Sequence, residues 1–134
     1  MALLGLDVGD KRIGIALAEG HLAVPIDVIE RTQEEEDMKQ VAALVREFGA
    51  ERIVVGLPRS MDGSIGKQAE SVLAFSKALA NHIGIPVDMC DERLTTVTAD
   101  RLMQESRAKR KKRKENIDAL AASVILQAYI DGME

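Results

Sequence analysis

The chain has 134 residues, of which 46% are hydrophobic and 2% aromatic, and its formal net charge is −4. This length predicts one domain with an aliphatic core. No stretch resembles a membrane span or a signal peptide, so we expect a cytoplasmic protein without a membrane partner. The single cysteine, Cys90, excludes an internal disulfide and is expected to be a small core residue.

The first strong pattern is an apolar strand, residues 3–9, that contains one carboxylate, Asp7. Burying a carboxylate is costly, so Asp7 needs a cation, hydrogen-bond donors or a raised pKa. Gly9 and Gly14 flank a turn that folds the chain back as a hairpin and leave the backbone beside Asp7 open to a ligand. We interpret Asp7 as the first ligand of a metal site.

The next elements are an edge strand and a helix. Residues 23–30 alternate loosely and carry a proline near their start, as an edge strand tolerates. The acidic residues 34–37 precede apolar residues at helical spacing, which end at Gly49. A solvated helix start explains this acidic cluster better than a second metal site does.

A short buried strand at residues 52–56 then leads into a turn-rich loop, residues 57–66, and a helix with Val72, Leu73 and Leu79 among its inward residues. A loop that opens a helix can present backbone N–H groups to a phosphate. The loop lacks the spacing of a nucleotide-binding P-loop, so an ordinary strand-to-helix connection is an equal alternative.

Two further carboxylates follow. Residues 85–90 form a predicted strand, and Glu92 lies just past its end, at the rim where open α/β sheets carry their sites. After a helix capped by Thr95 or Thr96, the last helix, residues 116–130, carries Asp118 on the same stripe as its buried residues. Alternatively, Asp118 only complements the helix dipole.

The three carboxylates, Asp7, Glu92 and Asp118, can meet at one rim of a sheet. Converged carboxylates raise one another's pKa values unless a cation neutralises them. Oxygen ligands favour Mg²⁺ or Mn²⁺ over zinc, and such ions activate water and stabilise the leaving oxygen of a phosphodiester. The pattern therefore predicts hydrolysis of a nucleic-acid backbone.

A dense basic segment near the C-terminus favours the same substrate. It contains seven of the eighteen basic residues, and the rest of the chain is strongly acidic. This asymmetry is typical of a chain that attracts a polyanion to one place, although the segment viewed alone fits a solvated loop equally well. Its basic residues are Arg107, Lys109, Arg110, Lys111, Lys112, Arg113 and Lys114.

Four motifs together resemble the YqgF/RuvX family of RNase H-like proteins. They span nearly the whole chain in the family's order: residues 5–16, 55–64, 91–96 and 117–122. The resemblance implies an α/β, RNase H-like fold with a mixed five-stranded sheet of order 3-2-1-4-5, strand 2 antiparallel, flanked by about four helices, and a single nuclease domain over residues 1–134. It also implies that Asp7, Glu92 and Asp118 form the catalytic, metal-binding triad.

The resemblance further implies a nuclease that matures the 5′ end of 16S ribosomal RNA, alongside an older assignment as a Holliday junction resolvase acting on branched DNA. We favour structured precursor RNA as the partner and leave ribosomal particles and a second copy of the chain open. We expect the loop 105–115 to be mobile until it binds nucleic acid. Further predicted backbone contacts are Arg12, Arg59 and Lys67.

Two other functions stay open on the sequence alone. The first is a non-catalytic nucleic-acid-binding factor that retains the fold. The second is an ATP-binding protein of the actin or sugar-kinase type, because the phosphate hairpin of such proteins also has an Asp and Gly pattern like residues 7–9. That fold closes a nucleotide between two lobes, and this chain has room for one.

Overall fold

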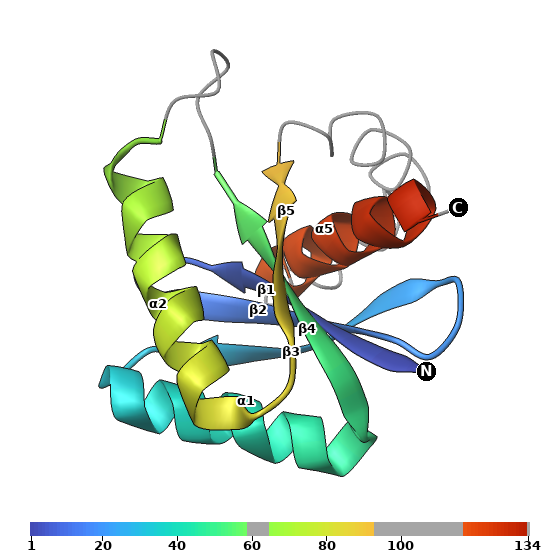
Figure 1. Cartoon of the computed structure of the whole chain (residues 1–134), viewed down its shortest axis with the longest axis horizontal. Helices are drawn as coiled ribbons and strands as arrows, with labels where there is room; N and C mark the ends of the chain where they lie inside the picture. The colour runs from blue at the N-terminus through green and yellow to red at the C-terminus, as the bar shows by residue number, and fades with distance from the viewer. Residues whose placement is uncertain (59–64, 93–116, 134) are drawn as a thin grey trace.

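The computed structural model describes residues 1–58, 65–92 and 117–133. They form a five-stranded sheet with helices on both faces (Figure 1). The sheet order is β3-β2-β1-β4-β5, which confirms the prediction. The strands are β1 (Ala2–Val8), β2 (Arg12–Ala18), β3 (Ala23–Glu30), β4 (Ala50–Leu57) and β5 (Val87–Asp91). The described helices are α1 (Glu34–Phe48), α2 (Lys67–Ile83) and α5 (Ile117–Met133).

Strand pairing is mixed, and β1 lies at the centre of the sheet. β1 pairs antiparallel with β2, which pairs antiparallel with β3. On its other side β1 pairs parallel with β4, which pairs parallel with β5. The predicted hairpin between β1 and β2 is therefore confirmed, and β3 is the predicted edge strand with Pro25 near its start.

Helices α1 and α2 cover one face of the sheet (Figure 1). They end at Gly49 and Gly84, whose φ angles of 64° and 76° are in the left-handed region that glycine favours. The prediction that Leu73 points inward is wrong, because Leu73 is 38% exposed whereas Phe75 is 2% exposed. Successive helical residues point about 100° apart, so the stripe that includes Val72, Phe75 and Leu79 turns Leu73 toward solvent.

Helix α5 covers the opposite face, and small residues let it approach closely. A Cβ atom on Gly5 of β1 would lie 2.7 Å from the Cβ atom of Leu126, closer than real Cβ contacts allow. Ala16 and Ala18 of β2 lie on this face, where Ala122 of α5 is fully buried. The face is therefore shaped for a helix that lies almost on the strand backbones.

Three helices lie in the described part of the chain, against the about four predicted. The fourth, expected after Thr95, falls outside the described residues, as do Arg59 and the segment 105–115. None of the described helices combines the length and hydrophobicity needed to cross a bilayer.

Candidate metal-binding and nucleic-acid site

Asp7 lies near the C-terminal end of the central strand, between two glycines on neighbouring strands. Residues alternate across a strand, so Asp7 points to the same face as Gly5, the face that α5 covers. On β2, Gly14 pairs directly with Asp7. On β4, Gly56 follows Val55, which pairs with Leu6. The half-buried carboxylate is thus flanked on both sides by positions without a side chain.

Asp118 fills the space above the first of these glycines. It lies in the first turn of α5, and a Cβ atom on Gly14 would overlap the backbone carbonyl of Asp118. The helix therefore begins directly on β2, beside Asp7. Burial, followed by the negative charge of Asp118, raises the pKa of Asp7 above its ordinary value.

Beside Ile125 of α5, whose Cδ1 atom is the nearest group, Glu92 occupies the space above the second glycine. It follows β5, and its Oε1 atom lies 3.0 Å from where a Cβ atom on Gly56 would be. Burial raises the pKa of Glu92 to about 7, with further contributions from the charges of Asp7 and Asp91. Asp7 therefore interacts electrostatically with both of the other predicted site residues.

Arg12 supplies positive charge at this cluster. Its Nε atom donates a hydrogen bond to Oδ2 of Asp118 over 2.9 Å, and both side chains are substantially exposed. Over residues 1–58, 65–92 and 117–133, no three His, Cys, Asp or Glu side chains stand close enough together to hold a metal ion. In this arrangement Asp118 binds Arg12 instead of completing a three-carboxylate group.

The donor chemistry nevertheless fits a hard divalent cation. Asp7 and Glu92 offer partly buried carboxylate oxygens whose ionisation is opposed first by burial and then by repulsion from neighbouring carboxylates. A cation removes that repulsion, and Mg²⁺ and Mn²⁺ prefer oxygen ligands. The oxygens of Asp7 and Glu92 are therefore of the kind that such an ion prefers.

The other predicted nucleic-acid contacts are only partly described. Lys67 is exposed at the first residue of α2. Arg59 lies outside the described residues, and so does the basic segment with Arg107, Lys109, Arg110, Lys111, Lys112, Arg113 and Lys114.

Sequence reasoning missed the part played by Gly14 and Gly56. The sequence predicts Gly14 as the flank of a turn that leaves the backbone open to a ligand, and Gly56 as the end of a strand. Their missing side chains instead make room for Asp118 at Gly14 and for Ile125 and Glu92 at Gly56. Glycine inside a strand is the available signal, because it marks a close approach of another group. The approaching partner cannot be identified from the local pattern alone.

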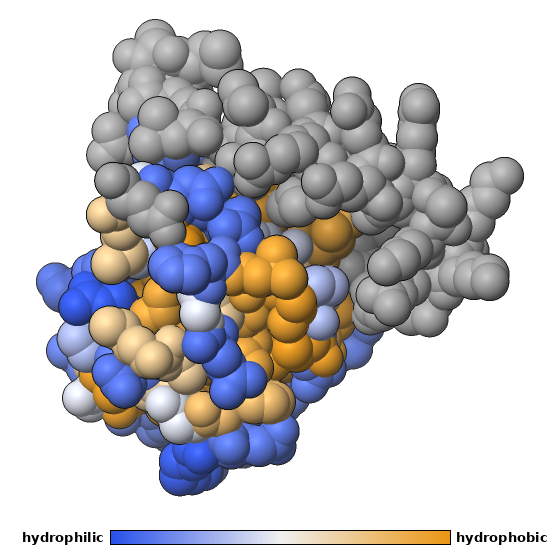
Figure 2. Space-filling model, turned by 90° about the vertical axis from the view of Figure 1, so that its right-hand side faces the viewer, coloured by the Kyte–Doolittle hydropathy of each residue, from blue (hydrophilic) through white to orange (hydrophobic). Residues whose placement is uncertain are grey.

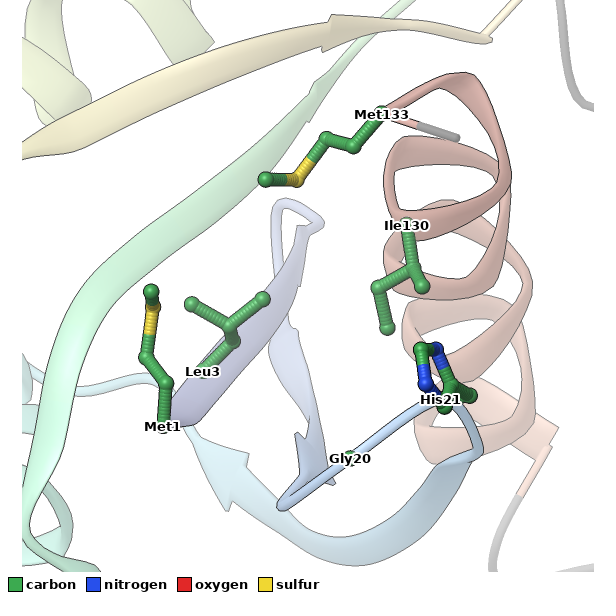
Figure 3. A pocket seen from close by; sticks show the side chains of 6 residues that line it. All are labelled: Met1, Leu3, Gly20, His21, Ile130 and Met133. Carbon is green, nitrogen blue, oxygen red and sulfur yellow. The ribbon is translucent and has the colours of Figure 1, made fainter.

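An apolar pocket of about 330 Å³ lies at the other end of the sheet (Figure 3). Leu3 lines it at the start of β1, whereas Asp7 lies near the end of that strand. Figure 2, which looks at the side of the molecule where Figure 1 places the N-terminus and the last turn of α5, shows hydrophobic residues bordered by hydrophilic ones. Because Leu3 and Asp7 lie near opposite ends of β1, this pocket is separate from the carboxylates. Its lining residues are Met1, Leu3, Gly20, His21, Ile130 and Met133.

Comparison with known proteins gives a family and a fold. Residues 1–132 match the model of the RuvX family, described as Holliday junction resolvase. A protein of Clostridium acetobutylicum named "Putative pre-16S rRNA nuclease" is 47% identical over 99% of this chain and 100% of its own length. A protein of Moorella thermoacetica with the same name is also 47% identical, over 98% of this chain and 95% of its own length.

Solved structures extend the likeness in fold. RuvC of T. thermophilus in complex with a Holliday junction substrate matches with a TM-score of 0.67 and 15% identity, covering 99% of this chain and 96% of its own. The fowlpox virus Holliday junction resolvase matches with a TM-score of 0.58 and 11% identity over 100% of both chains. At these identities the likeness establishes the architecture alone.

Proposed function

This chain belongs to the RuvX family, and on that premise we propose that it is a divalent-metal-dependent nuclease that cleaves phosphodiester bonds in precursor 16S ribosomal RNA. The observation that carries the proposal is the placement of Asp7 between Gly14 and Gly56. The backbone of Asp118 lies over the first glycine and the carboxylate of Glu92 over the second. Asp7 and Glu92, with Asp118 beside them, would hold a cation against a phosphate if Asp118 gave up its hydrogen bond from Arg12.

In this proposal Asp7, Glu92 and Asp118 hold Mg²⁺ or Mn²⁺. When bound, a divalent ion supplies Lewis-acid activation of the phosphodiester and of the attacking water. Asp7 and Glu92 contribute carboxylates that are already partly desolvated. Asp118 would hold the ion in place of its hydrogen bond from Arg12, and Arg12 would then bind a phosphate oxygen of the substrate.

The basic side chains hold the nucleic-acid backbone in this proposal. Arg12 lies at the carboxylates, and Lys67 begins α2. Together with Arg59 and the segment 107–114, they bind phosphates, so affinity for nucleic acid falls steeply as salt concentration rises. Because these are charge contacts, they select for the shape of the substrate more than for its base sequence.

Precursor ribosomal RNA is favoured as substrate because two relatives at 47% identity, matched over 100% and 95% of their own lengths, are named "Putative pre-16S rRNA nuclease". Cleavage of branched DNA is the second candidate, favoured by the family model's description as Holliday junction resolvase. A non-catalytic nucleic-acid-binding factor would show salt-dependent binding without cleavage of either substrate.

A parallel cleavage assay tests the function. Purified protein with Mn²⁺ or Mg²⁺ is given precursor 16S ribosomal RNA and, separately, a four-way DNA junction. Asp7→Asn is expected to lower the cleavage rate by more than about 100-fold, because even residues that only support metal ligands contribute about 10–100-fold. Asp10→Asn, a matched change at an exposed position in the β1–β2 turn, is expected to cleave normally. Cleavage that persists in EDTA would contradict the metal-dependent mechanism.

Thermal unfolding provides a readout that does not depend on activity. In EDTA, Asp7→Asn is expected to be more stable than the wild type by about 0.5–2 kcal/mol, because it removes a partly buried charge that Asp118 repels. Added Mn²⁺ is expected to raise the melting temperature of the wild type but not of the variant. Equal stabilisation of both proteins by Mn²⁺ would place the ion elsewhere.

A further inference from the structure

A carboxylate on the α1 side of the sheet is buried more completely than any of the three site acids. Asp37, in the first turn of α1, has 0% exposure, whereas its neighbours Glu34, Glu35 and Glu36 are exposed. The expected solvated helix start therefore does not include Asp37. Its Oδ1 atom accepts a hydrogen bond from the backbone N–H of Thr32 over 3.1 Å, and its Oδ2 atom accepts one from Nε of Arg31 over 3.3 Å.

Arg31 connects this buried carboxylate to the turn between β1 and β2. Its Nη1 atom donates a hydrogen bond to the carbonyl of Gly9 over 2.9 Å, and its backbone N–H donates to the carbonyl of Lys11 over 2.8 Å. The guanidinium lies 5.2 Å from the centre of the Phe75 ring, and the side chain is 20% exposed. The planar fork of arginine makes it possible to reach Asp37 and Gly9 at once.

The turn that Arg31 holds lies between two residues of the site. A third hydrogen bond, from the N–H of Gly9 to the carbonyl of Arg12 over 2.9 Å, closes the turn itself. The turn begins two residues after Asp7 and ends at Arg12, which binds Asp118. Any shift of the turn therefore moves Asp7, Arg12 or both relative to α5.

We propose that Arg31, oriented by Asp37, is a positioning residue for the nuclease site: it fixes the β1–β2 turn and thereby holds Asp7 and Arg12 in place beside Asp118. This inference rests on the proposed function. A buried ion pair adds little stability compared with well-packed apolar side chains of the same volume. Here the ion pair fixes the orientation of the Arg31 guanidinium toward the turn. An apolar residue at position 31 could pack but could not bind the carbonyl of Gly9.

Arg31→Lys tests this role without removing the charge or the backbone hydrogen bond to Lys11. A lysine has one ammonium group and cannot bind Asp37 and Gly9 in the same geometry. We expect Mn²⁺ affinity, measured by calorimetry, to fall by about 10–100-fold. We expect kcat for cleavage to fall by a similar factor at nearly unchanged KM, and the amide of Gly9 to exchange with solvent faster than in the wild type.

A second ion pair provides the matched control. Arg52 of β4 binds Asp88 of β5 near the other end of these strands, so Arg52→Lys makes the same chemical change away from the carboxylates. We expect it to leave Mn²⁺ affinity, kcat and the exchange of the Gly9 amide at wild-type values. Asp37→Asn should reproduce the Arg31→Lys effects. The double variant Arg31→Lys/Asp37→Asn should lower Mn²⁺ affinity and kcat no further than either single substitution does.

The outcomes separate the two proposals. If wild-type protein binds Mn²⁺ and cleaves, but Arg31→Lys behaves like Arg52→Lys in all three measurements, the positioning role is overturned and the function stands. If the wild type neither binds Mn²⁺ nor cleaves either substrate, the proposed function is overturned, and the positioning role with it. All measurements are made well below the melting temperature of each variant, so that loss of folded protein does not contribute.

Discussion

The two faces of the sheet are built from alternate residues of the same strands, yet their side chains differ in size and polarity. The face under α1 and α2 carries large apolar side chains, including Leu4, Leu6, Ile13, Ile15 and Val55. The face under α5 carries, on those strands, Gly5, Asp7, Gly14, Ala16 and Gly56. Burial of large side chains gives one face most of the stabilisation. The other face carries small side chains or none, so α5 packs close to the strands and places Asp118 beside Asp7.

The largest change in stability is expected on the α1/α2 face. Leu79 of α2 is fully buried, so Leu79→Ala should lower the free energy of unfolding by about 2–5 kcal/mol in chemical denaturation. Cleavage per folded molecule should be unchanged, because Leu79 packs on the side of the sheet away from the carboxylates. Leu73→Ala, at an exposed position of the same helix, should change stability by less than about 0.5 kcal/mol. Loss of cleavage by folded Leu79→Ala protein would show that packing on this face affects the site more widely than through Arg31 and Asp37.

An intermediate loss of stability but a larger loss of function is expected on the α5 face. A methyl group on Gly14 would overlap the Asp118 carbonyl, so Gly14→Ala should displace the start of α5 at a cost of about 1–3 kcal/mol. Mn²⁺ affinity and cleavage should fall even at temperatures where the variant is folded. Gly20→Ala is the control, because a Cβ atom there meets no atom within 4 Å. Normal Mn²⁺ binding by Gly14→Ala would contradict the assignment of Asp118 to the site.

The smallest change in stability is expected where α5 is hydrogen-bonded to β5. The Tyr129 hydroxyl donates a 2.6 Å hydrogen bond to Oδ2 of Asp88, and this bond, together with Arg52, lowers the pKa of Asp88. A carboxyl whose pKa is lower in the folded protein stabilises it above its ordinary pKa and loses that contribution as pH falls through the folded value. The wild type should therefore be slightly more stable than Asp88→Asn at neutral pH, and the difference should vanish in acid. A constant difference from pH 7 to pH 2 would contradict this explanation.

Much of the fold could be predicted from local patterns. Apolar runs identified the buried strands, loose alternation identified the edge strand, and Gly49 marked the end of the first helix, because glycine favours the left-handed conformation found there. Leu73 was misplaced because it lies about 100° around the helix from Val72, on the solvent side of the buried stripe that contains Phe75 and Leu79. Asp37 was misplaced because its partner, Arg31, lies in a preceding segment that no helical period relates to it.

The three acidic residues of the site could be predicted from the sequence more readily than the contacts that bring them together. Asp7 and Asp118 were conspicuous because a carboxylate stood in an apolar pattern, and Glu92 because it followed a strand; their role as metal ligands stays a prediction. The contact of Gly14 with Asp118 joins segments about a hundred residues apart, and only strand pairing and helix docking create it. Predicted contacts at Arg59 and in the segment 107–114 lie outside the described residues.

The close seating of α5 on glycine has a consequence for how activity can be lost. Asp7 lies on a strand of the sheet and Glu92 directly follows one, whereas Asp118 belongs to α5. This helix packs closely on the strands because glycines leave space beneath it. Partial opening that lifts only this helix would leave the five strands paired and two acids in place. Activity would then be lost although the sheet stays folded, because Asp118 would no longer lie beside Asp7.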